Sequence, residues 1–486
     1  MIPMDSDANW AVLLIVSPLA AAIIAFLAPR IAPRIALVNA VLTGTAAIGL
    51  LNAVNARPLT YALGNWGAPL GIDLYADSLT GILVVATSII MLSIAFYAPD
   101  YLARTRTSAS FWPLTFFLHA ALNGLYLSAD VFNLYVALEL LSLSAVALVA
   151  LGDKPAAIAA ALRYLLASLV ASMSYLFGVA LLYHTHGTLD LGLLADAGRN
   201  GATPWAALGL MTAGLAIKGA LFPVHFWLPA AHSEAPAPVG ALLSGLVVKT
   251  PFFVLLRLWF GPFLNAPQAV GVLFGLLGAA AILWGSVQAL RQERLKLLVA
   301  YSTVAQIGYL FLFFPLARTA RVLDAVTVFI LAHALAKGAM FLAAGNILFC
   351  LGHDRIRKLD QVAGRLPLSL AAFGIAGLCI MGLPPSGNFI AKWLLIEAAF
   401  ESGAWGWAVV IVAGSLMSAA YVFRVVGHAF TPEPGLESVA EVTTPMAWVP
   451  FLLALLALLL GLIAAPLLAI IDLPALADNA ATVHTP

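Results

Sequence analysis

Long apolar segments follow one another along almost the whole chain, and they constrain its fold more than any other feature. About 20 apolar residues in a helix are needed to cross the hydrocarbon core of a membrane. Segments of this kind predict about fourteen spanning helices, at residues 10–28, 34–54, 79–98, 111–128, 130–151, 156–184, 205–227, 238–260, 267–290, 297–316, 321–350, 368–400, 405–430 and 446–471. Only 9% of the residues are charged, whereas soluble domains carry about 25%. We therefore expect an all-α polytopic membrane protein without a soluble domain.

Two of the expected helices contain sequence that cannot continue as a regular helix. The seventh contains Phe222-Pro223-Val224-His225, and the twelfth contains Pro384-Pro385 between two glycines. Proline removes a backbone donor and clashes with the preceding turn. Paired broken helices, one in each half of a chain, indicate an inverted-repeat transporter. We therefore expect N-terminal helices 1–3 at 1–110, a first inverted repeat (helices 4–8) at 111–260, a second (helices 9–13) at 261–430, and helix 14 with a short tail at 431–486.

The basic residues between the helices predict an orientation. Links after odd-numbered helices hold Arg30, Arg34, Arg104, Arg106, Lys154, Arg291, Arg294, Lys296, Arg355, Arg357, Lys358 and Arg365, and links after even-numbered helices hold Arg57, Arg199, Arg257, Arg318 and Arg321. Cytoplasmic loops are enriched in Lys and Arg, so both termini are expected outside the cytoplasm. The link after the thirteenth helix is an exception, because it holds Glu433, Glu437 and Glu441 instead of basic residues. Acidic residues contribute little to this rule, so the predicted orientation stands. Asp5 and Asp7 replace the basic start of a signal peptide, so the first helix is expected to be retained.

Six titratable side chains lie inside the apolar segments, where a charge costs roughly 2.5–3.5 kcal/mol even on lenient insertion scales. They are Glu139, Lys218, Lys249, His333, Lys337 and Lys392. Groups kept at this depth are expected to move ions or protons. The plainer alternatives are hydrogen bonds that hold helices together, and lysines that reach to the membrane surface. A scaffold of that kind would tolerate replacement of each group without loss of transport.

Glu139 and Lys218 form the expected switch. Glu139 has no charged neighbour in its own segment, so its partner must come from another helix. Lys218 stands four residues before Phe222-Pro223, in the middle of the membrane if the break lies there. A lysine removed from water gives up its proton readily. The charge of Lys218 would therefore follow the charge of Glu139, which is how a proton can be loaded and released.

The remaining groups extend this pair into a relay. Lys249 follows in the eighth helix, and Lys392 stands seven residues after Pro385. His333 and Lys337 are four residues apart and share one helix face. Histidine titrates near neutral pH and is a natural proton shuttle. The sequence leaves open which of these two carries the proton.

Other candidate sites are weaker. His225 and His232 are seven residues apart with a proline between them, which suits a connecting proton path better than a zinc site. Cys350 and Cys379 lie in apolar helices and are expected to be core residues. The sequence has no CxxC pair, haem-attachment motif or Gly-rich nucleotide loop, so we expect no metal or cofactor on this chain. The net charge of +1 gives no indication of a nucleic-acid partner.

Several long motifs resemble one known family. They are the stretch from Lys218 to Lys249, Asp130 to Ser142, Leu297 to Tyr309, His333 to Phe341 and Gly382 to Lys392. Over residues 70–430 the chain resembles the antiporter-like subunits shared by respiratory complex I, Mrp-type Na⁺/H⁺ antiporters and membrane-bound hydrogenases. The resemblance departs from the family at Ala230, Gly240 and Gln306, where aspartate, serine and histidine are common.

The resemblance implies a fold and a function. It implies a fourteen-helix core with two inverted five-helix repeats and discontinuous helices 7 and 12. It implies that Glu139 pairs with Lys218, and that Lys249, His333 or Lys337, and Lys392 continue the charged axis. Lys392 and the compact length most resemble the D-type subunits of Mrp antiporters. That branch implies a proton-translocating subunit of a monovalent cation (Na⁺)/H⁺ antiporter, not itself an enzyme. Its partners would be other inner-membrane subunits, H⁺ and Na⁺. The alternative is a proton-pumping membrane subunit of NADH:quinone oxidoreductase or a membrane-bound hydrogenase.

Overall fold

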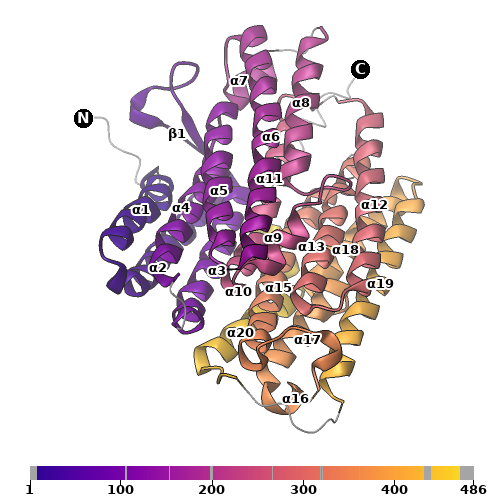
Figure 1. Ribbon diagram of the computed structural model, residues 1–486. Helices are drawn as coiled ribbons and strands as arrows, with labels where there is room; N and C mark the ends of the chain where they lie inside the picture. The colour runs from indigo at the N-terminus through magenta and orange to yellow at the C-terminus, as the bar shows by residue number, and fades with distance from the viewer. Residues whose placement is uncertain are drawn as a thin grey trace.

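The computed structural model describes residues 8–103, 107–152, 154–197, 201–264, 266–317, 319, 321–360, 362–431 and 439–470. This part of the chain is almost entirely helical (Figure 1). It contains ten helical stretches long and apolar enough to cross a membrane. The prediction of an all-α polytopic membrane protein is therefore confirmed. Of the predicted loop and terminal charges, Asp5, Asp7, Arg104, Arg106, Arg199, Arg318, Glu433 and Glu437 lie outside the described residues.

The first third of the chain forms six long helices and one hairpin. The helices are α1 (Ala8–Leu27), α2 (Ala32–Ala56), α3 (Ser78–Leu102), α4 (Ser108–Leu127), α5 (Val131–Ala150) and α6 (Pro155–His186), with a 3-10 turn, η1 (Pro29–Ile31), before α2. The strands β1 (Leu59–Ala62) and β2 (Asp73–Ala76) pair antiparallel with Leu59 opposite Ala76, and η2 (Leu63–Asn65) follows β1. This hairpin has no counterpart among the predicted elements, because it lies in the link between the predicted spans 34–54 and 79–98, whose prolines and glycines do not fit a spanning helix.

The middle of the chain contains the first broken helix. Its elements are α7 (Leu191–Asp196), α8 (Thr203–Lys218), α9 (Leu228–Glu234), α10 (Ala237–Gly245), η3 (Val247–Lys249) and α11 (Thr250–Phe260). The break predicted at Phe222-Pro223 is present between α8 and α9. The span predicted at 238–260 is present as Ala237–Phe260, and it contains a local interruption, because α10 ends at Gly245 and Lys249 closes a 3-10 turn. Pro251 lacks the N–H that would bond the carbonyl of Val247, and Thr250 Oγ1 donates to that carbonyl at 2.8 Å.

The last part contains the second broken helix. Its elements are α12 (Gln268–Arg291), α13 (Leu295–Phe311), α14 (Phe313–Leu316), α15 (Val322–Leu351), η4 (Ile356–Lys358), α16 (Val362–Arg365), α17 (Pro367–Met381), α18 (Gly387–Glu401), α19 (Gly406–Ala429), α20 (Thr444–Leu459) and α21 (Ala464–Ile470). The predicted break at Pro384-Pro385 lies between α17 and α18. Ser386 caps α18 by accepting from the N–H of Phe389 at 3.2 Å.

The core lies around α15 and around the segment formed by α10, η3 and α11. The most apolar 18-residue stretch of each is completely buried, whereas only about a third of the corresponding residues are buried in α1 and α19. Close packing of α10 on α15 requires a small residue at Gly345, where an added Cβ would lie 2.2 Å from the Cβ of Ala237. The inner helices thus hold their polar groups away from lipid by packing other helices around them.

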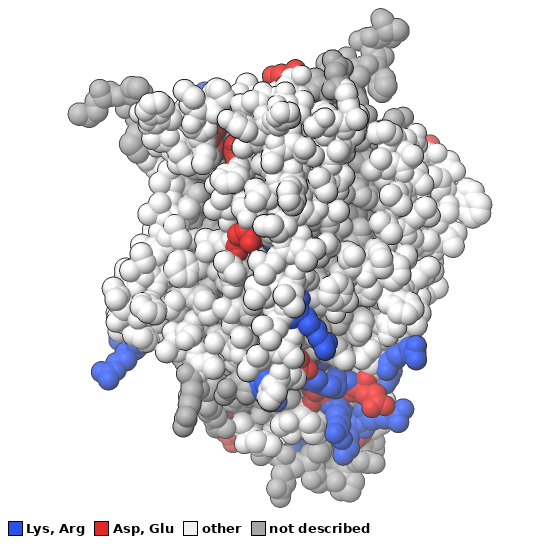
Figure 2. All heavy atoms as spheres, turned by 45° about the horizontal axis from the view of Figure 1, so that its top comes forward, with Lys and Arg blue, Asp and Glu red and all other residues white. Residues whose placement is uncertain are grey.

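Two of the basic residues that the sequence analysis places in links lie inside helices and are largely buried. Arg257 lies inside α11 and forms a two-bond ion pair with Asp77, which caps the start of α3, at 2.6 and 2.7 Å. Lys296 lies in the first turn of α13 and is only 3% exposed. Many of the other basic side chains gather at one end of the molecule, below a broad band almost free of charge (Figure 2).

Candidate functional site

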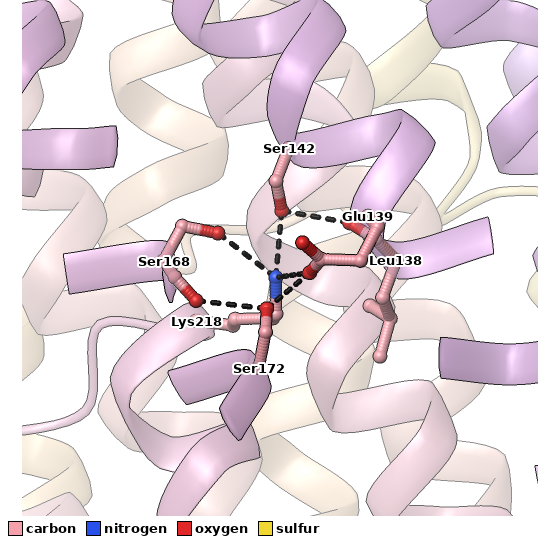
Figure 3. Close-up of polar contacts among 6 residues, drawn as sticks. All are labelled: Leu138, Glu139, Ser142, Ser168, Ser172 and Lys218. Carbon is pink, nitrogen blue, oxygen red and sulfur yellow. Dashed lines mark hydrogen bonds and ion pairs between the residues drawn. The ribbon is translucent and has the colours of Figure 1, made fainter. Parts of the chain in front are cut away.

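An ion pair between Glu139 and Lys218 joins α5 to the end of α8. Lys218 is the last residue of α8, just before the break, and its Nζ lies 3.1 Å from Glu139 Oε1. The same Nζ donates to Ser142 Oγ at 2.8 Å and to Ser168 Oγ at 2.9 Å. All three ammonium hydrogens therefore have an acceptor, as Figure 3 shows. The pairing implied by the family resemblance is present.

Three serines complete this pair, and the sequence analysis assigns them no role. Ser172 Oγ donates to Glu139 Oε1, and Ser142 Oγ lies 2.7 Å from the carbonyl oxygen of Leu138 (Figure 3). Their signal in the sequence is periodic. Ser142 follows Glu139 by three residues, and Ser168 and Ser172 are four apart on apolar α6, so each pair shares a helix face.

Lys249 lies at the interruption between α10 and α11. It is 2% exposed, and its Nζ donates to the carbonyl oxygens of Ser244 at 2.5 Å and Gly245 at 2.7 Å. These carbonyls belong to the last turn of α10, where the helix leaves acceptors unpaired. The ammonium of Lys249 therefore supplies the hydrogen-bond donors that the last turn of α10 lacks.

His333 and Lys337 are both completely buried on α15. Lys337 Nζ donates to the carbonyl oxygen of Val299 at 3.0 Å and to Ser302 Oγ, both on α13. Neither ring nitrogen of His333 has a hydrogen-bond partner among the described residues. The side chains that act on His333 electrostatically include Lys249, Lys337 and Lys392. His333 therefore lies among three lysines without a bond to any of them.

Lys392 closes the second broken helix. Its Nζ donates to the carbonyls of Ile380 at 2.9 Å and Met381 at 3.1 Å, at the end of α17, and to Ser415 Oγ at 3.1 Å. It also lies 4.3 Å from the centre of the Tyr309 ring. The C-terminal end of a helix carries partial negative charge, so the ammonium of Lys392 lies where a cation is favoured.

The two candidate path histidines occupy different surroundings. His232 on α9 is completely buried, neither of its ring nitrogens has a partner among the described residues, and Lys249 and Lys337 act on it electrostatically. His225 is 9% exposed at the break and stacks on Phe222 with ring centres 5.5 Å apart. The structure thus brings His232 to the central lysines and leaves His225 beside the break.

The site therefore has two kinds of cation position. Lys218 has a carboxylate partner, whereas the bonds of Lys249, Lys337 and Lys392 among the described residues go to carbonyl and hydroxyl oxygens. A position without a counter-charge favours the neutral amine more strongly than a paired position does. The described residues contain no group of three or more His, Cys, Asp or Glu side chains able to hold a metal ion. The arrangement suits transfer of protons between amines.

Comparisons with known proteins agree with this arrangement. A family model described as NADH:quinone oxidoreductase/Mrp antiporter, TM, matches residues 128–418. The N-type subunit of NADH-quinone oxidoreductase from Desulforudis audaxviator is 37% identical over 88% of this chain and 88% of its own length. The D-type subunit of the Na⁺/H⁺ antiporter from Bacillus subtilis is 28% identical over 93% of this chain and 94% of its own.

Three solved structures are similar over almost the whole chain. A chain of the Mrp complex from Dietzia sp. DQ12-45-1b is 25% identical, with a TM-score of 0.87 over 96% of both chains. A chain of an archaeal membrane-bound sulfane sulfur reductase is 26% identical, with a TM-score of 0.88 over 96% of this chain and 97% of its own. A chain of respiratory complex I from Thermus thermophilus is 27% identical, with a TM-score of 0.77 over 95% and 98%.

Proposed function

Because the chain belongs to the NADH:quinone oxidoreductase/Mrp antiporter family of transmembrane subunits, we propose that it is a proton-translocating subunit of a monovalent cation (Na⁺)/H⁺ antiporter. The family makes it an ion-translocating membrane subunit of a complex I-type or Mrp-type assembly. The antiporter is the more specific proposal. The observation that supports the proposal is the ion pair of Glu139 and Lys218, beside the break that follows α8. Such a pair can couple a change of charge to the release of a proton.

The proposed architecture is fourteen spans in which two inverted five-helix repeats occupy 111–260 and 261–430. The position of the lysines supports this division. Lys218 ends the helix before the first break, and Lys392 bonds to the end of the helix before the second. In each repeat, a lysine thus lies at the end of the helix that precedes the break. The basic end of the molecule in Figure 2 supports a cytoplasmic position for that end and external termini.

The proposed mechanism begins when the Glu139–Lys218 pair opens. Two unit charges about 4 Å apart attract by roughly 4 kcal/mol at an effective dielectric constant of 20. Separation removes that stabilisation from the ammonium of Lys218, which then releases its proton. The proton passes to Lys249, then by His333 or Lys337 to Lys392, with His232 beside the central lysines. The serines around Lys218 hold its amine in place between transfers.

A redox-driven assembly is the second candidate. The relative that is 37% identical is named a subunit of NADH-quinone oxidoreductase, and a sulfane sulfur reductase chain is among the similar structures. In that setting the same relay would be driven by electron transfer in partner subunits. Purification of the native assembly distinguishes the two. Partners with flavin or iron–sulfur centres favour the redox complex, and small membrane subunits without them favour the antiporter.

The test of the relay is Lys218→Met in the complete complex. Proton flux linked to ΔpH in everted vesicles should fall by about 100-fold, a typical contribution of a positioned proton-transfer group. Lys358→Met is the matched control, because Lys358 is exposed in η4, and its flux should equal wild type. Wild-type flux in assembled Lys218→Met complexes would show that the mechanism is wrong.

A further inference from the structure

Lys296 is a further buried lysine, which the relay described above does not use. It lies in the first turn of α13, and its Nζ donates to the carbonyl oxygen of Ala235, just after α9. An ammonium group has three hydrogens to donate, and this is the one bond of that Nζ among the described residues.

A cluster of charges separates Lys296 from solvent. Arg294 Nη1 lies 2.5 Å from Glu234 Oε1, and Arg294 Nε lies 3.2 Å from Asp354 Oδ1. Asp354 Oδ2 also accepts from the backbone N–H of Lys296 at 3.3 Å. The Arg294 side chain is 41% exposed, whereas the side chains of Glu234 and Asp354 are 16% and 7% exposed. The cluster thus runs from water to the buried amine.

Lys296 lies on the same helix, α13, as both acceptors of Lys337. Val299, whose carbonyl accepts from Lys337, is one helical turn further on, a rise of about 4.5 Å. Ser302, the second acceptor of Lys337, is about 9 Å along the axis from Lys296. Lys296 and both acceptors of Lys337 therefore lie within the first turns of one helix. α13 connects the charged cluster to the centre of the proposed relay.

We propose that Lys296 is a proton carrier between the charged end of the molecule and Lys337. The inference rests on the proposed function. The ammonium of Lys296 gives one proton, through bridging water, to the neutral amine of Lys337, which becomes the ammonium. The neutral Lys296 then takes one proton from hydronium in the solvent beside Arg294, which leaves a neutral water molecule, so the net result is one proton moved from solvent to Lys337. The charged groups that act on Lys296 are Asp354, Glu234, Arg294 and Lys154.

The test compares three substitutions of Lys296 in the complete complex. Lys296→Arg keeps the positive charge and can donate to Ala235, but arginine does not release its proton. A carrier role predicts that Lys296→Arg and Lys296→Met both lower proton flux in everted vesicles by about 100-fold. Lys296→His should keep measurable flux with a pH profile moved to the acid side, because imidazole titrates near 6.5. Lys358→Met is the exposed control at the same end, because Lys358 in η4 is not among the groups that act on Lys296.

The outcomes separate this inference from the proposed function. Wild-type flux in assembled Lys296→Arg complexes overturns the carrier role, because a purely structural lysine tolerates arginine. If Lys218→Met loses flux in the same vesicles while Lys296→Arg keeps it, only the role of Lys296 is wrong. If Lys218→Met keeps flux, the proposed function fails first. Where Lys296→Met does not assemble, the arginine and histidine variants decide the question.

Discussion

At the scale of single residues, the sequence predicts the bonding partners of some buried lysines but not of others. The partnership of Glu139 with Lys218 could be expected, because a lone carboxylate in lipid needs a cation and the family motif supplies one. The acceptors of Lys249, and two of the three acceptors of Lys392, are backbone carbonyls, which carry no residue signature. Lys296 was misplaced because a charge at the end of a predicted span is counted as a loop charge. Burial there depends on how neighbouring helices pack.

The serines around Lys218 should affect transport without affecting assembly. Ser142→Ala and Ser168→Ala each remove one acceptor from the ammonium, and a buried group without its partner costs about 1–3 kcal/mol. We expect each variant to lower proton flux several-fold and the double variant to lower it further. Ser174→Ala on the same helix is the control, since Ser174 bonds to Leu210 and not to the pair. Unchanged flux in the double variant would contradict a positioning role.

Gly382 should be essential for the position of Lys392. Its φ is +79°, and an added Cβ would lie 2.7 Å from Cδ of Lys392. Gly382→Ala therefore strains the backbone by about 1–2 kcal/mol and displaces the amine from Ile380 and Met381. Flux should fall strongly in complexes that still assemble. Gly374→Ala is the matched control in α17, because an added Cβ there meets nothing within 4 Å; equal flux in the two variants would refute the assignment.

At the scale of elements, the ends of the broken helices were predictable from proline and glycine, but the turn at Lys249 was not. Thr250-Pro251 could have marked it, since proline favours the first turn of a new helix. The β1–β2 hairpin, which lies within one link, and the Asp77–Arg257 pair were also missed. The pair depends on a contact between segments far apart in the chain. Arg257 is 180 residues from Asp77. Sequence periodicity within one segment contains no information about such a contact.

The Asp77–Arg257 pair should hold α11 to the start of α3. Their side chains are 8% and 10% exposed, and Arg257 also donates to Thr80 Oγ1 at 2.9 Å. Loss of one partner leaves a buried charge and should cost about 3–5 kcal/mol. Arg257→Met should therefore lower the thermal stability of the purified complex more than the double variant Arg257→Met/Asp77→Asn does. A double variant less stable than Arg257→Met would argue against the pair as a clamp.

At the scale of the whole molecule, the uneven distribution of charge predicts how the chain lies in the membrane. Thr185 and Arg357 are exposed and lie in parts of the chain assigned to opposite sides. Thr185→Cys should react with a membrane-impermeant maleimide in intact cells, and Arg357→Cys should react only in everted vesicles. The native Cys350 and Cys379 are buried, so background labelling should be low. The reverse pattern would invert the orientation and, with it, the side from which Lys296 is reached.

The separation of Glu139 and Lys218 along the chain has a consequence for biosynthesis. The two residues are 79 positions apart, so α5 emerges from the ribosome well before α8. At about 5–20 residues per second, the delay is roughly 4–16 s. During that time α5 is present without the cation partner of its carboxyl group. When α8 arrives, the Glu139–Lys218 ion pair forms between the two helices. The pair that would control proton release is therefore made while the chain is still folding.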